Sequence, residues 1–472
     1  MKTVILATNN AHKVSEISNA LDFPGWEFKT LAEAGIHSDP DEDADTFLGN
    51  ARIKAMAARA ASGGMAALAD DSGLEVDALN GAPGVYSSRF AGEEATDQDN
   101  NDKLLADLAG VPDDERTARF VCTLVFIDEV QEAPEVVTHV KRLLDHKEYD
   151  FALSGSLLGV ELENVRSFPV GYVTEVGMLP LDFEEFCWAM GAGPNVFDTL
   201  RECLESEAPV PDYLHERMTG LFRRYLLVGG MPDAVVVHRE SGGIDGVRAV
   251  HEDIRTQYRR DITKYAPKER RLVIQDIYDR VPSQLAQQNR RFKLSDIPNV
   301  KRFANVADDF LWLTKAGVAH VVYNVAAPVY PLRVNEQRRT VKLFMADTGM
   351  LTSTFVKRDT AGILDGKPVG YLGGVYENAA VQELVAHGAH PYYFTKRGIG
   401  ELDALFERPD GTVVAVEIKS GSSYRTHRAI DNALATEHYG IDEAYVAAEV
   451  NIERDGRVLY VPAYLLGMVA EG

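Results

Sequence analysis

Two adjacent carboxylates, Asp70 and Asp71, follow a short apolar run and precede Ser72 and Gly73. Carboxylates at a strand end suit Mg²⁺, which prefers hard oxygen ligands and shares its coordination sphere with substrate phosphates. A carboxylate in this position could also orient a water for attack on a phosphoryl group. A polar turn gives the same pattern, so the pair alone leaves two interpretations open.

A phosphate-binding turn is predicted near the N-terminus. Residues 3–7 are apolar and mostly β-branched, and they predict a buried strand that enters the polar segment from Thr8 to Lys13. A helical pattern follows, so free backbone N–H groups and the Lys13 ammonium would point at one spot. A phosphate is stabilised at such a helix N-terminus. An ordinary turn between a strand and a helix is the alternative.

An acidic loop at residues 39–45 leads into a predicted helix over residues 46–61. Asn50 and Lys54 lie one turn apart on a single face of this helix. Together with the two preceding motifs, these residues predict a site for a phosphorylated ligand and a metal within residues 1–122.

The three motifs stand in the segments LATNNAHK, TFLGNARIKA and ALADDSGLEVDALNGAPGVYSSRFAG. Together they resemble the XTP/dITP diphosphatase (inosine triphosphatase) family over about residues 1–122. The resemblance implies Mg²⁺-dependent hydrolysis of deaminated purine nucleoside triphosphates to a monophosphate and pyrophosphate. It implies that Glu42 and Asp71 hold the metal, and that Asp71 is also the base that activates water. The residues expected to contact the substrate are Thr8, Asn9, Asn10, His12, Lys13, Asn50, Lys54 and Ser72.

Two motifs of that family are absent from this sequence. The family has a Phe-Gly-Tyr-Asp loop and a late Ser-His-Arg motif, which both help to recognise the purine base, and neither string occurs here. We therefore expect the second lobe of the cleft, and the wall that it forms, to be missing.

Residues 123–127 form an apolar run that ends in Asp128 and Glu129. The run predicts a buried parallel strand with carboxylates at its C-terminal end. This is the Walker B arrangement, in which the Asp supports Mg²⁺ and the Glu orients water for ATP hydrolysis. However, the sequence contains no G-x-x-x-x-G-K-[ST] string, so the cradle for the β- and γ-phosphates is missing. We expect no ATP turnover from these two residues, whereas ATP binding stays open.

A hairpin is predicted around Asp410, because two strand-like runs flank a three-residue loop that ends in glycine. Centring the hairpin on Asp410 places Asp403 opposite Glu417, with Lys419 two residues further on the same face. Two carboxylates and a lysine resemble the metal-and-water site of PD-(D/E)xK nucleases, and this resemblance implies that Glu377 on the preceding helix could complete it. A surface hairpin with a salt bridge is the alternative.

The sequence from about residue 123 to residue 472 resembles a second family, in segments such as FIDEVQEAPEVVTHVKRLL, FALSGSLLGV and GELDALFERPDGTVVAVEIKSG. This family consists of prokaryotic AAA-type ATPases with a PD-(D/E)xK nuclease-like C-terminal domain. The resemblance implies an ATPase fragment at 123–195, a helical region at 196–282, a winged-helix-like region at 283–350 and a nuclease-like domain at 351–472. The predicted fold class is therefore multidomain α/β, with an incomplete pyrophosphatase-type lobe at the front.

One set of motifs ends at Cys122 and the other begins at Thr123, which predicts a chimera of two proteins. Three functions remain open. The first is hydrolysis of XTP or ITP by the front part. The second is a DNA-associated remnant of an ATPase that binds ATP without turnover. The third is an inactive chimera in which neither cleft is complete.

The formal net charge of −23 excludes a general nucleic-acid coat, because binding to many phosphates needs an excess of Lys and Arg. Residues 255–302 nevertheless hold 13 Lys and Arg against 5 Asp and Glu. This stretch is either a solvated helical face or a surface for DNA, which the winged-helix-like region would extend. Three cysteines without metal-ligand spacing favour a reducing compartment, and no apolar run reaches the ~18 residues of a membrane span. We therefore expect a cytoplasmic protein.

Overall fold

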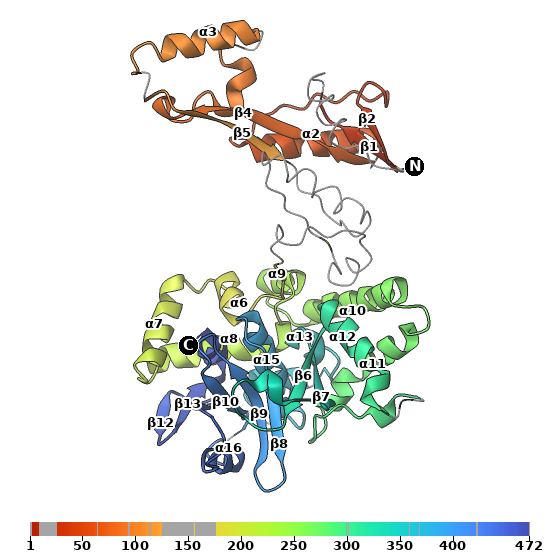
Figure 1. Ribbon diagram of the computed structural model, residues 1–472, viewed down its shortest axis with the longest axis vertical. Coiled ribbons are helices and arrows are strands. Elements are labelled where there is room, and N and C mark those ends of the chain that lie inside the picture. The colour runs from red at the N-terminus through yellow and green to blue at the C-terminus, as the bar shows by residue number, and fades with distance from the viewer. Residues whose placement is uncertain are drawn as a thin grey trace. The chain divides into compact units, whose positions relative to one another are not determined.

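The computed structural model describes residues 2–8, 26–63, 65–92, 95–112, 115–124, 155, 176–298, 300, 302–357, 359–367, 369–421 and 423–471. The chain divides into two compact units, Met1–Glu175 and Val176–Gly472 (Figure 1). Six residues for which the sequence predicts a role lie outside the described residues: Asn9, Asn10, His12, Lys13, Asp128 and Glu129.

The first unit contains a three-stranded parallel sheet in the order β2–β1–β3. Its strands are β1 (Lys2–Leu6), β2 (Trp26–Thr30) and β3 (Ala66–Leu68). Helix α2 (Phe47–Ala61) contributes Ala58 to a small core with Ile5, Ala7 and Leu31. The predicted strand at residues 3–7 and helix at 46–61 are thus confirmed, with Thr46 as the N-cap that accepts a hydrogen bond from the Gly49 N–H.

The described part of the first unit also contains a two-stranded antiparallel sheet, helix α3 (Asp97–Asp107) and two 3₁₀ helices, η1 (Asp77–Leu79) and η2 (Gly84–Arg89). Strand β4 (Asp70–Val76) pairs with β5 (Ala118–Leu124), and Asp71 lies opposite Thr123 in this register. The strand expected at residues 123–127 was predicted to be parallel. That prediction is wrong for the two residues that the structure describes, because Thr123 and Leu124 end an antiparallel strand.

The second unit is built on one mixed sheet of eight strands in the order β12–β13–β11–β10–β9–β8–β6–β7. The pairs β10–β11, β11–β13 and β6–β8 are parallel, and the other pairs are antiparallel. The strands are β6 (Ala319–Val325), β7 (Glu336–Met345), β8 (Tyr392–Lys396), β9 (Gly400–Glu407), β10 (Val413–Ile418), β11 (Glu443–Ala448), β12 (Glu453–Asp455) and β13 (Val458–Pro462).

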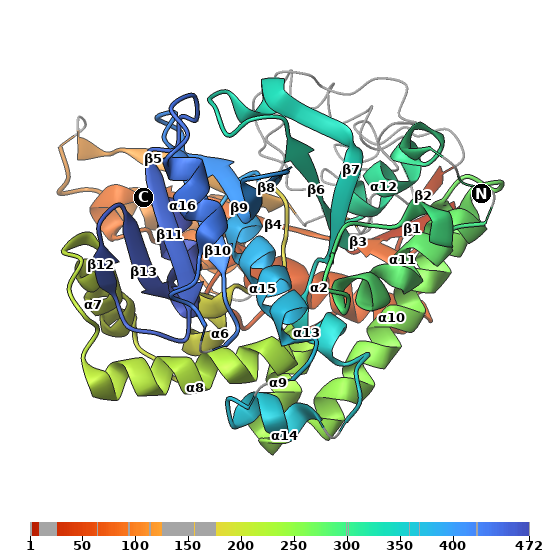
Figure 2. The same ribbon diagram turned by 90° about the horizontal axis from the view of Figure 1, so that it is seen from below.

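Helices surround this sheet, and the stretch expected to be helical, residues 196–282, is indeed helical for most of its length. Helix α15 is buried along nearly all of its length and packs against β7 and β10 (Figure 2). The helices are α6 (Phe183–Ala189), α7 (Pro194–Glu205), α8 (Asp212–Val228), α9 (Pro232–Ser241), α10 (Asp245–Tyr265), α11 (Arg271–Leu285), α12 (Ala307–Lys315), α13 (Thr348–Thr352), α14 (Asp359–Leu364), α15 (Leu372–Ala386), α16 (Arg428–Leu434) and α17 (Leu466–Glu471).

Residues 283–350, for which a winged-helix-like region is expected, contain α12 and the hairpin β6–β7. This hairpin joins the large sheet, because β6 pairs in parallel with β8 over residues 323–325. Phe292 also donates its N–H to the Val341 carbonyl at 2.8 Å, which ties the chain after α11 to β7. The hairpin therefore belongs to the same sheet as the predicted nuclease-like strands.

Candidate active site

The pair Asp70-Asp71 follows the end of an apolar strand, as expected, but it also begins the next strand. Strand β3 ends at Leu68, and the chain becomes extended again at Asp70, where β4 begins in a different sheet. Gly73 allows this path, because a Cβ at this position would lie 2.4 Å from the Gly84 carbonyl oxygen. The carboxylates therefore lie where the chain passes from one sheet to the next, and Asp71 is held by the pairing of β4 with β5.

Lys54 links the two residues for which a metal-binding role is predicted. Its Nζ lies 2.8 Å from Asp71 Oδ1 and 3.3 Å from Glu42 Oε2. The side chain of Lys54 is 18% exposed, so this ion pair is partly open to solvent. The ammonium thus lies between two carboxylates from distant parts of the sequence.

Two hydrogen bonds fix the acidic loop that carries Glu42. Arg89 donates from Nη2 to the Glu42 carbonyl at 3.1 Å, and the Ala44 N–H donates to Asn50 Oδ1 at 3.0 Å. Asn50 is completely buried, and its Nδ2 has no partner among the described residues. The structure therefore uses the oxygen of Asn50 to hold the loop, and only its amide nitrogen is left for the predicted contact with phosphate.

Glu42, Lys54 and Asp71 border a cavity of about 260 Å³. Six residues that the sequence singles out line it, namely Thr8, Glu42, Lys54, Asp70, Asp71 and Ser72. Sequence reasoning assigned no role to Ser38, Asp39 or Ser88, which also line it. Asp39 lies in the acidic loop that the sequence does indicate, whereas no signal in the sequence points to the two serines.

The cavity has a chemistry that suits a divalent cation. Its lining has four carboxylates, those of Asp39, Glu42, Asp70 and Asp71, against the single ammonium of Lys54. Asp71 Oδ2 is buried and has no hydrogen-bond partner among the described residues. Within these residues no three acidic, His or Cys side chains are close enough to enclose a metal ion. A Mg²⁺ ion held by Asp71 and Glu42 would therefore take its other ligands from water and substrate oxygens, as is usual for this ion.

The second candidate site lies in the hairpin β9–β10, whose predicted register is confirmed. Val416 pairs with Ala404 in this antiparallel register, so the adjacent residues, Glu417 on β10 and Asp403 on β9, lie opposite each other. Asp403 Oδ2 accepts a hydrogen bond from the Ile418 N–H at 2.8 Å. Lys419 Nζ lies 2.6 Å from Glu417 Oε1, while Glu417 Oε2 is buried without a partner among the described residues. Burial raises the pKa of Glu417, as does Asp403, and Lys419 opposes this effect.

Glu377 on α15 has two basic neighbours that the sequence does not indicate. Lys342 Nζ on β7 lies 3.2 Å from Glu377 Oε2, and Arg290 bonds to Glu377 Oε1. Lys342 Nζ also lies 2.8 Å from Glu401 Oε1. Burial alone would lower the pKa of Lys342, but its carboxylate neighbours outweigh this effect and raise the pKa. Burial also raises the pKa of Glu377, and the two cations oppose that shift.

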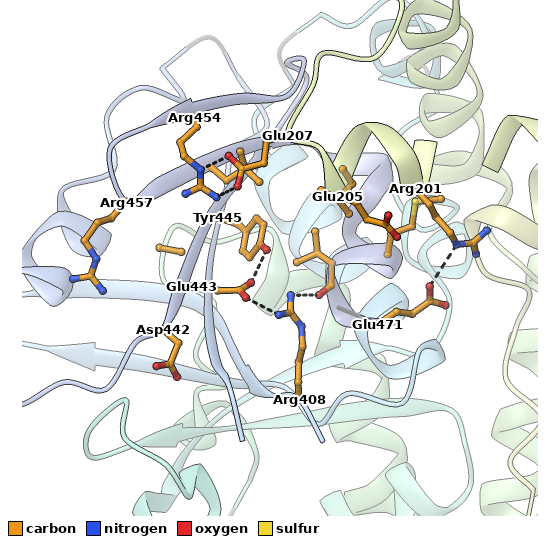
Figure 3. A pocket seen from close by; sticks show the side chains of 15 residues that line it. Arg201, Glu205, Glu207, Arg408, Asp442, Glu443, Tyr445, Arg454, Arg457 and Glu471 are labelled. Carbon is orange, nitrogen blue, oxygen red and sulfur yellow. Dashed lines mark hydrogen bonds and ion pairs between the residues drawn. The ribbon is translucent and has the colours of Figure 1, made fainter. Parts of the chain in front are cut away.

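A larger cavity of about 360 Å³ lies in the second unit, and none of its lining residues has a predicted role (Figure 3). Its arginines are paired with neighbouring groups. Arg454 bonds to Glu207, and Arg408 lies 2.8 Å from Glu443. The lining has four arginines and five acidic residues, so positive and negative charge nearly balance and the cavity does not favour an anion.

The basic stretch 255–302 is partly neutralised within the described part of the chain. Six of its arginines form ion pairs with acidic side chains, namely Arg255, Arg259, Arg270, Arg280, Arg290 and Arg291. Their partners lie on the same helices or on neighbouring elements. This arrangement leaves fewer free charges for DNA than the sequence suggests. Among the described residues no helix is long and apolar enough to cross a membrane.

Comparison with known proteins shows three matching regions. Residues 4–141 match the Ham1 family, which extends beyond the boundary predicted at residue 122. Residues 219–360 and 372–464 match two domains of unknown function, DUF8612 and DUF4143. The comparison therefore assigns no activity to the second unit.

Relatives of the first unit have named activities. The dITP/XTP pyrophosphatase of Vibrio parahaemolyticus is 49% identical over 141 residues, which are 30% of this chain and 70% of that protein. The dITP/XTP pyrophosphatase of Escherichia coli O157:H7 is 47% identical over 139 residues, which are 29% of this chain and 70% of the relative. A solved HAM1 protein from Coxiella burnetii is 42% identical, with a TM-score of 0.25, and the match covers 26% of this chain and 62% of that chain. This chain thus spans less than two thirds of the solved structure.

Proposed function

This chain belongs to the Ham1 family through its N-terminal residues, and we propose that its first unit hydrolyses deaminated purine nucleoside triphosphates to a monophosphate and pyrophosphate. The observation that carries the proposal is the buried Asp71 Oδ2, which has no partner among the described residues and belongs to a residue that lines an acidic cavity. The relatives named as dITP/XTP pyrophosphatases supply the substrate class.

The geometry supports a division of roles in this reaction. Asp71 would take the proton of the attacking water as the bond between the α- and β-phosphates breaks and pyrophosphate leaves. Lys54 would turn from Glu42 and Asp71 towards the phosphates, with Thr8 and Ser72 as further contacts. Mg²⁺ at Glu42 and Asp71 would neutralise the developing charge on the phosphates. A purine-binding wall has no part in this division of roles, because the corresponding motifs do not occur in the sequence.

The test is pyrophosphate release from ITP and XTP by the full chain. Asp71→Asn should lower the rate by about 10²–10⁴-fold, which is the usual contribution of a general base. Asp107→Asn is the matched control, because Asp107 pairs with Lys103 on the exposed face of α3 and should leave the rate unchanged. Equal rates for Asp71→Asn and the parent chain, or no release by the parent chain, would contradict the proposal. The second result would favour the inactive chimera.

The same assay with ATP tests base selection. Because the two base-recognition motifs are absent, we expect ITP and ATP to be hydrolysed at rates that differ less than tenfold. Strong preference for ITP would show that other residues of this chain grip the base.

A second candidate function concerns the second unit. We propose that Asp403 and Glu417 hold a divalent cation with Lys419 beside it, as in the metal-and-water site of PD-(D/E)xK nucleases. Glu417 is 6% exposed, and its Oε2 lacks a partner among the described residues, which supports a cation there. Mg²⁺-dependent cleavage of DNA should be lost in Asp403→Asn and retained in Asp455→Asn, an exposed carboxylate on β12. Cleavage that is unchanged in Asp403→Asn would remove this site from consideration.

A further inference from the structure

Lys342 occupies an unusual place for a lysine. It lies on β7, opposite Val322 of β6, and its side chain is 0% exposed. Lysine is almost never fully buried unless it is paired, because removing an ammonium from water is costly. Here Glu377 and Glu401 provide the counter-charges, and the Tyr393 ring lies beneath the ammonium, with its centre 5.1 Å from Nζ.

Glu377 is fully engaged by this arrangement. Its Oε2 contacts Lys342 and its Oε1 contacts Arg290, so each carboxylate oxygen already has a basic partner. Glu401 is held in a similar way, because Arg291 lies 3.1 Å from its Oε2 while Lys342 contacts Oε1. Neither carboxylate has an oxygen without a cation beside it.

Glu417, the hairpin carboxylate that lies opposite Asp403, differs in this respect. Glu417 has Lys419 at Oε1 only, and its Oε2 is buried with no partner in the described parts of the chain. Both oxygens of Glu377 and of Glu401 therefore lie beside a cation, whereas Glu417 has one oxygen that lacks one.

We infer that Lys342 is a built-in cation of this cluster, and that Glu377 serves Lys342 and Arg290 rather than completing the metal site as its position in the sequence suggests. A divalent cation would then be held by Asp403 and Glu417 alone. The inference deepens the second proposed function, since it concerns the same site. It does not require that the site cleaves DNA.

The test is Mn²⁺ binding to the full chain, measured by electron paramagnetic resonance in an Asp71→Asn background that disables the N-terminal site. Glu377→Gln should retain Mn²⁺ binding, weakened by no more than about tenfold through loss of a nearby negative charge, because no metal contact is lost, whereas Asp403→Asn should abolish binding. Loss of binding in Glu377→Gln would overturn the inference. Absence of Mn²⁺ binding in the parent would contradict the second proposed function but not the inference about Lys342. In that case the Lys342→Met variant tests the inference.

Lys342→Met removes the cation and keeps the length of the side chain. It should raise Mn²⁺ affinity by at least about tenfold, because Glu377 and Glu401 lose their shared positive charge. Lys342→Arg keeps the charge and should behave as the parent does. Unchanged affinity in Lys342→Met would overturn the inference.

If Lys342→Met fails to fold, a measurement on the unmutated chain can still test whether Lys342 is held inside the cluster. Acetic anhydride labelling followed by mass spectrometry should modify Lys419, which is 26% exposed, at least about tenfold faster than Lys342. Comparable labelling of the two lysines would show that Lys342 is not held inside the cluster, and would also overturn the inference.

Discussion

The two units each place a lysine between two carboxylates, yet the two lysines differ in their access to water. Lys54 lies between Glu42 and Asp71 and is 18% exposed, whereas Lys342 lies between Glu377 and Glu401 and is 0% exposed. An ammonium near the surface can exchange its carboxylate partners for water or a phosphate at low cost. An ammonium in the interior cannot, because any displaced charge would lose its partner without gaining solvent. The first arrangement suits a working site, and the second suits a permanent part of the fold.

The largest expected difference is in stability. Lys342→Met should lower the free energy of unfolding of the second unit by about 3–5 kcal/mol, because it leaves buried carboxylates without their cation. Lys54→Met should lower the stability of the first unit by only about 0–1 kcal/mol, as expected for a pair near the surface. Urea unfolding followed by tryptophan fluorescence measures both, since Trp188 and Trp312 report on the second unit and Trp26 on the first.

Similar losses of unfolding free energy in Lys342→Met and Lys54→Met would contradict the proposed difference between the two lysines. A large loss for Lys54→Met would mean that its ion pairs hold the first unit together. In that case Lys54 could not turn to a substrate phosphate without a substantial cost in stability.

Removal of divalent metal provides a second, smaller contrast. Chelation with EDTA should abolish pyrophosphate release from ITP, because Asp71 and Glu42 then lack the cation that completes the site. The same treatment should change the stability of the second unit by less than about 1 kcal/mol, because Lys342 supplies the main internal cation there. Added Mg²⁺ should restore the activity. A second unit that unfolds on chelation would instead point to a structural metal.

The smallest effect is expected for DNA binding by residues 255–302. Six arginines of this stretch are already in ion pairs, so charge reversal at the exposed Arg260 and Lys268 should weaken DNA retention by less than about tenfold at 150 mM salt. Filter binding at several salt concentrations measures this change. A much larger and strongly salt-dependent loss would restore the interpretation of this stretch as a DNA-binding surface.

Local patterns in the sequence predicted several elements well. The strand at residues 3–7, the helix at residues 46–61 and the turn around Asp410 each depend on neighbours in the chain, and each prediction is confirmed. The register of the β9–β10 hairpin followed from its short loop, which fixes which residues lie opposite each other. These signals are local, so one sequence suffices to interpret them.

Features that depend on distant contacts could not be predicted in this way. The path of the chain at Asp70 depends on the close approach of Gly73 to Gly84. Lys342 lies in a strand where alternation alone does not say which face is buried, and its partners Glu377 and Glu401 come from other elements. The neutralisation of residues 255–302 likewise involves Asp309, Glu377 and Glu401, which lie beyond the stretch itself.

The pairing of β4 with β5 has a consequence for the predicted chimera. The register places Asp71 opposite Thr123, so the expected seam runs along the strand that supports the proposed base. Neighbouring strands are joined through peptide groups, which every residue except proline supplies in full. A donor chain of foreign origin could therefore support that aspartate as well as the ancestral one did, provided that it offered an extended backbone of sufficient length. Such a replacement would be tolerated because backbone N–H and C=O groups are the same in almost every residue, so strand pairing does not require matching side chains.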